Sequence, residues 1–189
     1  MQSLNKYYIL PITHTKQPME ITKTPQDSFA SMMEIVLPND TNSIHNLRGG
    51  KILHWMDICS AVSAGRHAEA VVVTVTVDQV TFANPIKMGD VVTITSKVTR
   101  AFNTSIETRI EVWAENLPTK TRYKCNEAYY TFVALDSNLK PKHVPPIVPQ
   151  TAEEIAEYNK ASQRRELRLL LAGKIKASEA KELKSLIEG

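Results

Sequence analysis

The chain has 189 residues, which is enough for one domain with an appendage but not for two full domains. Hydrophobic residues make up 42% and charged residues 23%, so we expect a packed core rather than a disordered chain. With 23 basic and 20 acidic residues, the net charge of +3 is too balanced to indicate nucleic acid as the main partner.

The two cysteines, Cys59 and Cys125, indicate neither a disulfide framework nor a metal site. A chain of this size needs no disulfide, and no Cys/His cluster has the spacing of a zinc site. No apolar run approaches the ~20 residues of a membrane span. Residues 1–11 also lack the apolar region of a signal peptide. We therefore expect a cytoplasmic protein without a bound metal.

The N-terminal part of the chain changes from polar to strongly apolar. Residues 1–28 are polar and interrupted by three prolines, which predicts an irregular arm. A first strand is predicted from Phe29 to Leu37, and residues 38–50 form a polar loop that ends in Gly-Gly. The apolar stretch from Lys51 to His67 has no proline and one late glycine, which favours a long helix.

Four further strands are predicted after this helix, because apolar and polar residues alternate along each of them. The predicted strands cover residues 71–80, 91–100, 105–113 and 122–135. Short connections containing turn residues separate them. This arrangement predicts that consecutive strands are antiparallel neighbours.

The last part of the chain reads as an appended helical segment. The proline-rich stretch 144–149 cannot continue a sheet interior. Thr151 and Glu154 then have the spacing of a capping box, which predicts a charged helix over 151–172 and a second over 177–188. We divide the chain into an arm (1–28), a central domain (29–149) and a helical extension (150–189).

This order of elements predicts an α+β fold in which one long central helix is wrapped by a curved antiparallel sheet of about five strands. The helix covers one face of the sheet, so the other face needs cover or solvation. Dimerisation into a larger continuous sheet would be one solution.

The central helix carries an aspartate where burial is expected. Apolar residues point in nearly every direction around this helix, which is typical of a buried helix. Asp57 lies in its middle, and a buried carboxylate is costly unless it is paired, hydrogen-bonded or functional. In one interpretation Asp57 lies at an edge, solvated or paired with Lys51, Arg66 or another residue. In the other, it belongs to a functional site.

The start of the same helix is a candidate anion site. Gly49 and Gly50 leave backbone N–H groups uncovered, and the helix dipole makes this end slightly positive. Such an end suits the oxyanion of a thioester carbonyl or a phosphate. A plain tight turn into a helix is the alternative interpretation.

Several short motifs together resemble the acyl-CoA thioesterase family of the hotdog fold, over roughly residues 30–165. Each motif alone is weak, but they occur in the family's order. They are Pro-Asn-Asp-Thr-Asn (38–42), Gly-Gly-Lys-Ile-Leu (49–53), Trp-Met-Asp (55–57), Asp-Gln-Val-Thr-Phe (78–82), Gly-Asp-Val-Val (89–92), Ser-Ile-Glu (105–107) and Glu-Val-Trp (111–113).

The resemblance implies acyl-CoA as the substrate, with no metal or cofactor. It implies Asp57 as the catalytic carboxylate, acting as general base or nucleophile, and Asn42 as the residue that faces it from another hotdog unit. The N–H groups of Gly50 and Gly49 would polarise the thioester carbonyl. Because this chain has one hotdog unit, the resemblance implies at least a homodimer, and a trimer of dimers by analogy with family members.

Other residues are given provisional roles. Family geometry makes the turn between two strands a candidate for coenzyme A contacts, although an ordinary polar turn is an equal alternative; its residues are Arg100, Asn103, Thr104 and Ser105. We expect Trp55, Met56 and Cys59 in the core, Arg66 and His67 at the helix C-terminus complementing its dipole, and Arg164 and Arg165 on a solvated helix face.

Two other functions remain open. Asp40, Asn42 and His45 have the spacing of the motif in hotdog enoyl-CoA hydratases, in which aspartate and histidine activate water. A non-catalytic acyl-CoA sensor is the second, although the chain has no evident output module. The tail helices could also serve a further partner, which the sequence does not identify.

Overall fold

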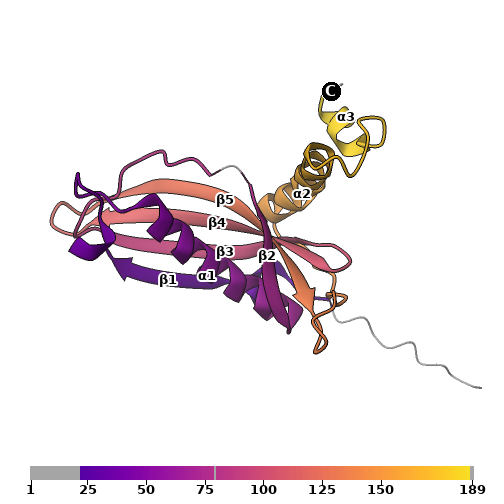
Figure 1. The fold of residues 1–189 in the computed structure, drawn as a ribbon, viewed down its shortest axis with the longest axis horizontal. Coiled ribbons are helices and arrows are strands. Elements are labelled where there is room, and N and C mark those ends of the chain that lie inside the picture. The colour runs from indigo at the N-terminus through magenta and orange to yellow at the C-terminus, as the bar shows by residue number, and fades with distance from the viewer. Residues whose placement is uncertain (1–21, 79, 188–189) are drawn as a thin grey trace, which may run out of the picture.

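A computed structural model of the protein describes residues 22–78 and 80–187. Its centre is a five-stranded antiparallel sheet in the order β1-β3-β4-β5-β2 (Figure 1). All five predicted strands are confirmed to within a few residues at most ends. Their bounds are β1 (Ala30–Ile35), β2 (Val71–Val77), β3 (Val91–Ala101), β4 (Ser105–Asn116) and β5 (Thr121–Leu135). Of the predicted arm, residues 1–21 lie outside the described residues, and Pro25–Ser28 form a 3-10 turn.

The position of β2 in the sheet differs from the prediction. The alternation predicted β2 as the neighbour of β3, but β2 pairs with the far side of β5, with Val73 opposite Val133. The turns 102–104 and 117–120 are short and force β3, β4 and β5 to be neighbours. The connection 78–90 is long enough to pass from one edge of the sheet to the other. Both β1 and β2 are therefore edge strands.

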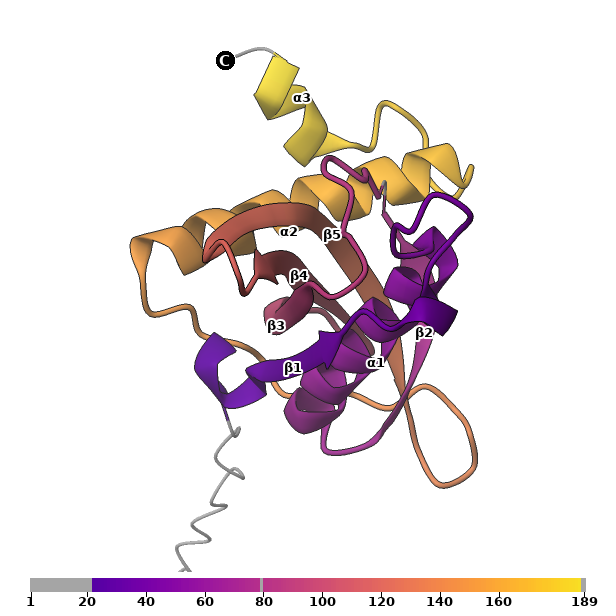
Figure 2. The ribbon, with the colours of Figure 1, turned by 90° about the vertical axis from the view of Figure 1, so that its left-hand side faces the viewer.

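The central helix α1 (Gly49–Ala68) lies in the curve of the sheet and contacts all five strands (Figure 2). Trp55, Met56 and Cys59 are buried in the core as predicted. The prediction that the helix is buried all round is wrong, because Ile58 and Val62 are 42% and 44% exposed. The sheet of one chain covers α1 from one side only, so an apolar stripe of Ile58 and Val62 stays uncovered.

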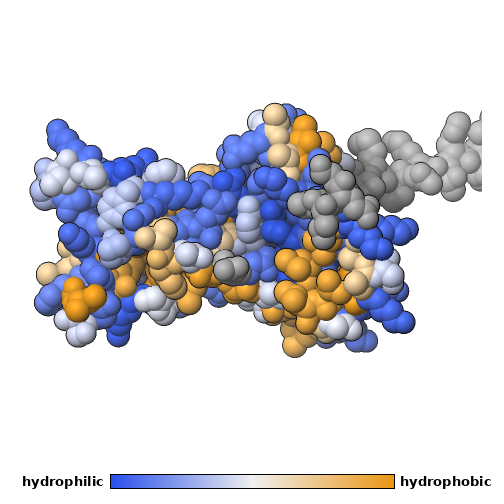
Figure 3. All heavy atoms as spheres, turned by 90° about the horizontal axis from the view of Figure 1, so that it is seen from above, coloured by the Kyte–Doolittle hydropathy of each residue, from blue (hydrophilic) through white to orange (hydrophobic). Residues whose placement is uncertain are grey.

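The edge strand β2 also exposes apolar side chains. Its four odd-numbered valines are between 41% and 65% exposed; these are Val71, Val73, Val75 and Val77. Figure 3 shows hydrophobic side chains gathered at the end of the molecule where β2 lies. An edge strand with unpaired backbone groups and apolar side chains is a template for pairing with another chain.

Two helices follow the sheet. The capping box of Thr151 and Glu154 is confirmed at the start of α2 (Ala152–Leu171), where the Thr151 side chain accepts a hydrogen bond from the Glu154 N–H. Helix α2 crosses the face of the sheet opposite α1 (Figure 2). Helix α3 (Lys181–Ile187) begins later than predicted. Among the described residues, no helix has both the length and the apolar character needed to cross a membrane.

A buried carboxylate anchors α2 to the sheet. The Glu107 side chain on β4 is fully buried and accepts hydrogen bonds from Thr99 Oγ1 at 2.8 Å, Arg164 Nη2 at 2.8 Å and Arg168 Nη1 at 3.0 Å. The Arg164 guanidinium also lies 3.7 Å from the centre of the Tyr129 ring. The expectation of a solvated face is therefore wrong for Arg164, although Arg165 is exposed.

We predict that Glu107→Gln destabilises the protein by about 1.5–3 kcal/mol, because it removes a fully buried charge that two guanidinium groups share and leaves Arg164 with Glu157 and Arg168 with Asp78 as their remaining ionic partners. Urea denaturation followed by circular dichroism measures the change. Lys97→Ala is the matched control: it breaks a partly exposed ion pair of 3.9 Å with Glu154 and should cost about 1 kcal/mol or less. Equal effects of the two substitutions would contradict the anchoring role of Glu107.

His67 is buried at the C-terminal end of α1, with Nε2 2.8 Å from the Pro145 carbonyl oxygen. Burial lowers the pKa of His67 below its ordinary value of 6.5, more than the Pro145 carbonyl raises it. Lys23 nearby lowers the pKa further, while Asp27 and Glu69 act to raise it. The buried imidazole is therefore neutral at pH 7. The prediction that His67 complements the helix dipole as a cation is wrong.

The lowered pKa makes stability depend on pH. Below about pH 6.5, His67 becomes protonated in the unfolded chain but not in the folded one. The stability that the neutral, buried imidazole contributes is therefore fully present above that pH and is lost as the pH falls. We predict that, between pH 6.5 and 5.5, the free energy of unfolding of wild type falls by up to about 1.4 kcal/mol more per pH unit than that of His67→Gln. Urea denaturation at the two pH values measures this, and parallel losses would show that His67 is not the titrating group.

Candidate active site

Asp57 lies half-buried on α1, facing β2. Its Oδ1 accepts a hydrogen bond of 2.7 Å from Thr74 Oγ1. The predicted cationic partners are engaged elsewhere: Lys51 Nζ is 3.1 Å from an Asp40 oxygen, and Arg66 donates to the Phe29 carbonyl. Among the described residues, no cation forms an ion pair with Asp57. The carboxylate is thus held by a neutral hydroxyl and keeps free lone pairs for a proton.

Tyr130 of β5 lies near Asp57 and is 1% exposed. Burial raises the pKa of Tyr130 to about 12, and the negative charge of Asp57 contributes to the increase. The phenol is therefore neutral at physiological pH. It offers Asp57 a low-dielectric neighbour without competing for a proton.

The N-terminus of α1 presents free donors. Gly49 and Gly50 are exposed, the N-cap residue Arg48 makes no side-chain cap, and neither glycine N–H has an acceptor among the described residues. The Phe82 ring lies 3.5 Å from the position that a Cβ on Gly49 would take. A Cβ there would make ordinary contact with this ring, and glycine leaves the backbone beside it uncovered.

Asn42 is fixed beside this helix end by its own loop. Its Oδ1 accepts hydrogen bonds of 3.1 Å from the N–H groups of Ile44 and Asn46. The amide nitrogen makes no hydrogen bond among the described residues and is left as a donor. Asn42 and Gly49 both line a cavity of about 330 Å³.

Asn42 and Asp57 are not brought together within one chain. Asp57 is not among the residues that line the cavity at Asn42. The rise of 1.5 Å per residue places Asp57 about 12 Å along α1 from Gly49. One chain therefore separates the predicted site residues into two groups: the carboxylate beside Thr74, and the asparagine with the glycine N–H groups.

The turn between β3 and β4 has mostly structural contacts. Arg100 Nη1 donates to the Tyr158 carbonyl at 3.0 Å, and its guanidinium lies 4.1 Å from the Tyr158 ring centre. Arg100 therefore helps to hold α2, and its role toward coenzyme A stays a prediction. The side chains of Asn103, Thr104 and Ser105 have no hydrogen bond among the described residues, so their coenzyme A contacts stay a prediction.

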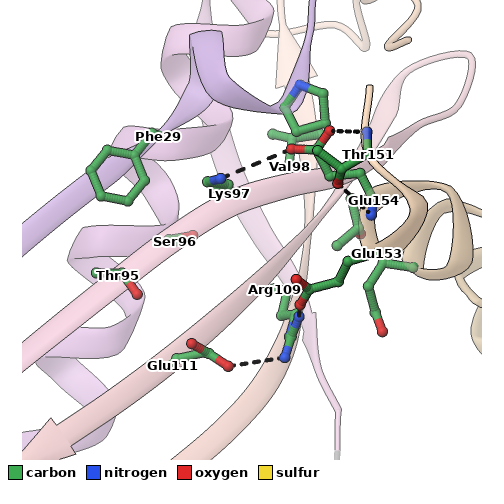
Figure 4. A pocket seen from close by; sticks show the side chains of 13 residues that line it. Phe29, Thr95, Ser96, Lys97, Val98, Arg109, Glu111, Thr151, Glu153 and Glu154 are labelled. Atoms are coloured by element: carbon green, nitrogen blue, oxygen red, sulfur yellow. Dashed lines mark hydrogen bonds and ion pairs between the residues drawn. The ribbon is translucent and has the colours of Figure 1, made fainter. Parts of the chain in front are cut away.

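A second cavity of about 350 Å³ lies between the sheet and the start of α2 (Figure 4). Its charged side chains pair with one another. Arg109 is 2.7 Å from Glu153 and 2.9 Å from Glu111, and Lys97 faces Glu154. None of the predicted site residues lines this cavity, and its paired charges leave no evident anion site.

The aspartate of the predicted hydratase motif, Asp40, is engaged in structural contacts. Asp40 is 5% exposed, and its two oxygens accept from Lys51 Nζ and the Leu37 N–H. Burial acts to raise the pKa of Asp40, but these hydrogen bonds outweigh it and the pKa is lowered. His45 is exposed, with a left-handed backbone and no hydrogen bond to Asp40. Both oxygens of Asp40 are thus engaged, which leaves the carboxylate poorly available to activate a water.

A curved antiparallel sheet wrapped around one long helix is the architecture of a hotdog protein. The thioesterase superfamily model matches residues 45–120. The uncharacterised acyl-CoA thioester hydrolase YkhA of Bacillus subtilis is 40% identical over 147 residues, which cover 75% of this chain and 86% of that protein. The chain belongs to the acyl-CoA thioester hydrolase family of this superfamily, a family of hydrolases.

Solved structures agree with this assignment. An apo-hexameric acyl-CoA thioesterase has a TM-score of 0.78 at 37% identity, with coverage of 80% of this chain and 98% of that chain. The acyl-CoA hydrolase of Staphylococcus aureus, solved with butyryl-coenzyme A and coenzyme A, has a TM-score of 0.76 at 32% identity over 89% of this chain and 100% of that one.

Variants of the S. aureus enzyme were also solved. They replace an aspartate, a threonine or an asparagine by alanine. The asparagine stands 15 positions before the aspartate, and the threonine stands 17 positions after it.

Proposed function

We propose that this protein hydrolyses acyl-CoA thioesters at a site shared by two protomers, with Asp57 from one and Asn42 from the other. The observation that carries the proposal is the division of α1 into two half-sites. The carboxylate and the oxyanion donors are each well placed, yet about 12 Å apart along one helix. A second protomer laid antiparallel alongside would bring complementary halves together.

The residue spacing supports the same set of groups. Asn42 stands 15 positions before Asp57, and Thr74 stands 17 positions after it. These are the separations between the three residues replaced in the S. aureus variants. Thr74, which carries no local signal in the sequence, thereby joins the proposed site as the residue that orients Asp57.

The proposed chemistry needs no group beyond these residues. Asp57 takes a proton from water as the water oxygen attacks the thioester carbonyl carbon. The carbonyl oxygen gains negative charge and accepts hydrogen bonds from the N–H groups of Gly50 and Gly49. Asn42 orients the water or the thioester. The carbon–sulfur bond then breaks, and coenzyme A leaves as a thiol after taking a proton, with the free acid as the other product.

The exposed apolar surface of α1 and β2 supports homo-oligomer formation. The apolar stripe of Ile58 and Val62 and the edge strand β2 are exposed in one chain. Pairing through this region would cover apolar area and bring the partner's α1 near Asp57. A trimer of such dimers is supported by the hexameric thioesterase that the chain resembles. The enoyl-CoA hydratase alternative is weaker, because Asp40 is already bound by Lys51.

We predict that Asp57→Asn lowers kcat for release of coenzyme A from butyryl-CoA by about 10²–10⁴-fold. Thr74→Val, which removes one hydrogen bond to a charged group, should cost about 10–100-fold. Thr76→Val, on the same strand but without a contact to Asp57, is the matched control and should stay near wild type. Full activity of Asp57→Asn would remove the carboxylate from the mechanism. Hydration of an enoyl-CoA by wild type, abolished by His45→Ala, would favour the hydratase chemistry.

A further inference from the structure

A buried amide faces the cavity at the start of α1. Asn126 is on β5 and two residues before Ala128, in the alternating set with Tyr130 that faces the core. Its side chain is 4% exposed. Neither its Nδ2 nor its Oδ1 has a hydrogen-bond partner among the described residues. A buried amide with both groups unsatisfied is rare in folded proteins and calls for a ligand or water.

The cavity joins this amide to the proposed site. Asn126 lines the same space of about 330 Å³ as Asn42 and Gly49, the two residues of the oxyanion half-site. Apolar side chains, including those of Ile52 and Phe82, make up most of the remaining wall. Thr108 is likewise buried without a partner, but it lines neither cavity. Ser96 Oγ is also buried without a partner and lines the other cavity, whereas Asn126 lines the cavity of the predicted site residues Asn42 and Gly49.

We propose that Asn126 is a specificity-determining residue that binds an oxygen on the acyl group. This proposal rests on the proposed function. A thioester carbonyl bound at the N–H groups of Gly49 and Gly50 directs its acyl chain along the cavity toward Asn126. The preferred substrates are acyl-CoAs with a hydroxyl or keto oxygen on the chain, such as 3-hydroxyacyl- or 3-oxoacyl-CoA.

The physical reason is the cost of an unpaired amide. A hydroxyl can accept from Nδ2 and donate to Oδ1, whereas a methylene at the same place displaces water and satisfies neither. Sites built to bind a polar group discriminate strongly against analogues that lack it. With one amide involved, we expect a preference of about 10–100-fold.

The test compares kcat/KM for 3-hydroxybutyryl-CoA and butyryl-CoA, two substrates of equal chain length. Wild type should favour the hydroxylated substrate by about 10–100-fold. Asn126→Leu, close in volume but apolar, should bring the ratio near one by raising butyryl-CoA turnover and lowering that of the other substrate. Thr108→Val, a matched loss of a buried polar group away from the cavity, should keep the wild-type ratio.

The outcomes separate this inference from the proposed function. Equal kcat/KM values in wild type overturn the role of Asn126 while leaving the hydrolase assignment intact, and they do so without any variant having to fold. A wild-type preference that Asn126→Leu retains also overturns it, provided that circular dichroism shows native folding. If wild type releases coenzyme A from neither these two nor longer acyl-CoAs, the proposed function itself fails.

Discussion

The geometry of α1 is the constraint on which the proposed site depends. A straight α-helix holds Asp57 about two turns from its own N-terminus, so the carboxylate and the N–H donors of Gly49 and Gly50 cannot reach one carbonyl within a chain. The sheet fixes this helix from one side and leaves Ile58 and Val62 uncovered. Function and assembly are thereby joined, because the surface that a partner would cover adjoins the carboxylate that the partner would complete.

The fold was largely predictable from local patterns. Strand alternation and the apolar stretch before His67 are short-range signals, and they located the sheet and α1 to within a few residues at most ends. The pairing of β2 with β5 was not predictable in the same way, since it depends on how a long connection crosses the sheet. The charged helix α2 looked solvated because its sequence does not show that Glu107, on a distant strand, is buried beneath it.

The site residues also differ in how far they could be predicted from the sequence. Asp57 was conspicuous because a carboxylate conflicts with an apolar helix, and the glycines because they open that helix with uncovered N–H groups. Asn42 came from the family resemblance alone. Thr74 gave no signal, since a threonine in an alternating strand is ordinary. Asn126 was detectable in principle, as it interrupts the inward-facing set that continues with Ala128 and Tyr130. Arg100 was assigned to coenzyme A from family geometry and its residue type, and its hydrogen bond to the Tyr158 carbonyl could not be predicted from either.

The most direct test of a shared site is complementation between two inactive variants. Asn42→Ala and Asp57→Ala should each lack activity, because each damages both sites of a homodimer. Unfolded together and refolded at equal concentrations, they should recover about a quarter of wild-type activity, since half of the dimers are mixed and each mixed dimer has one intact site. Mixed dimers that form, as shown by a tag on one variant, but stay inactive would contradict a site divided between protomers.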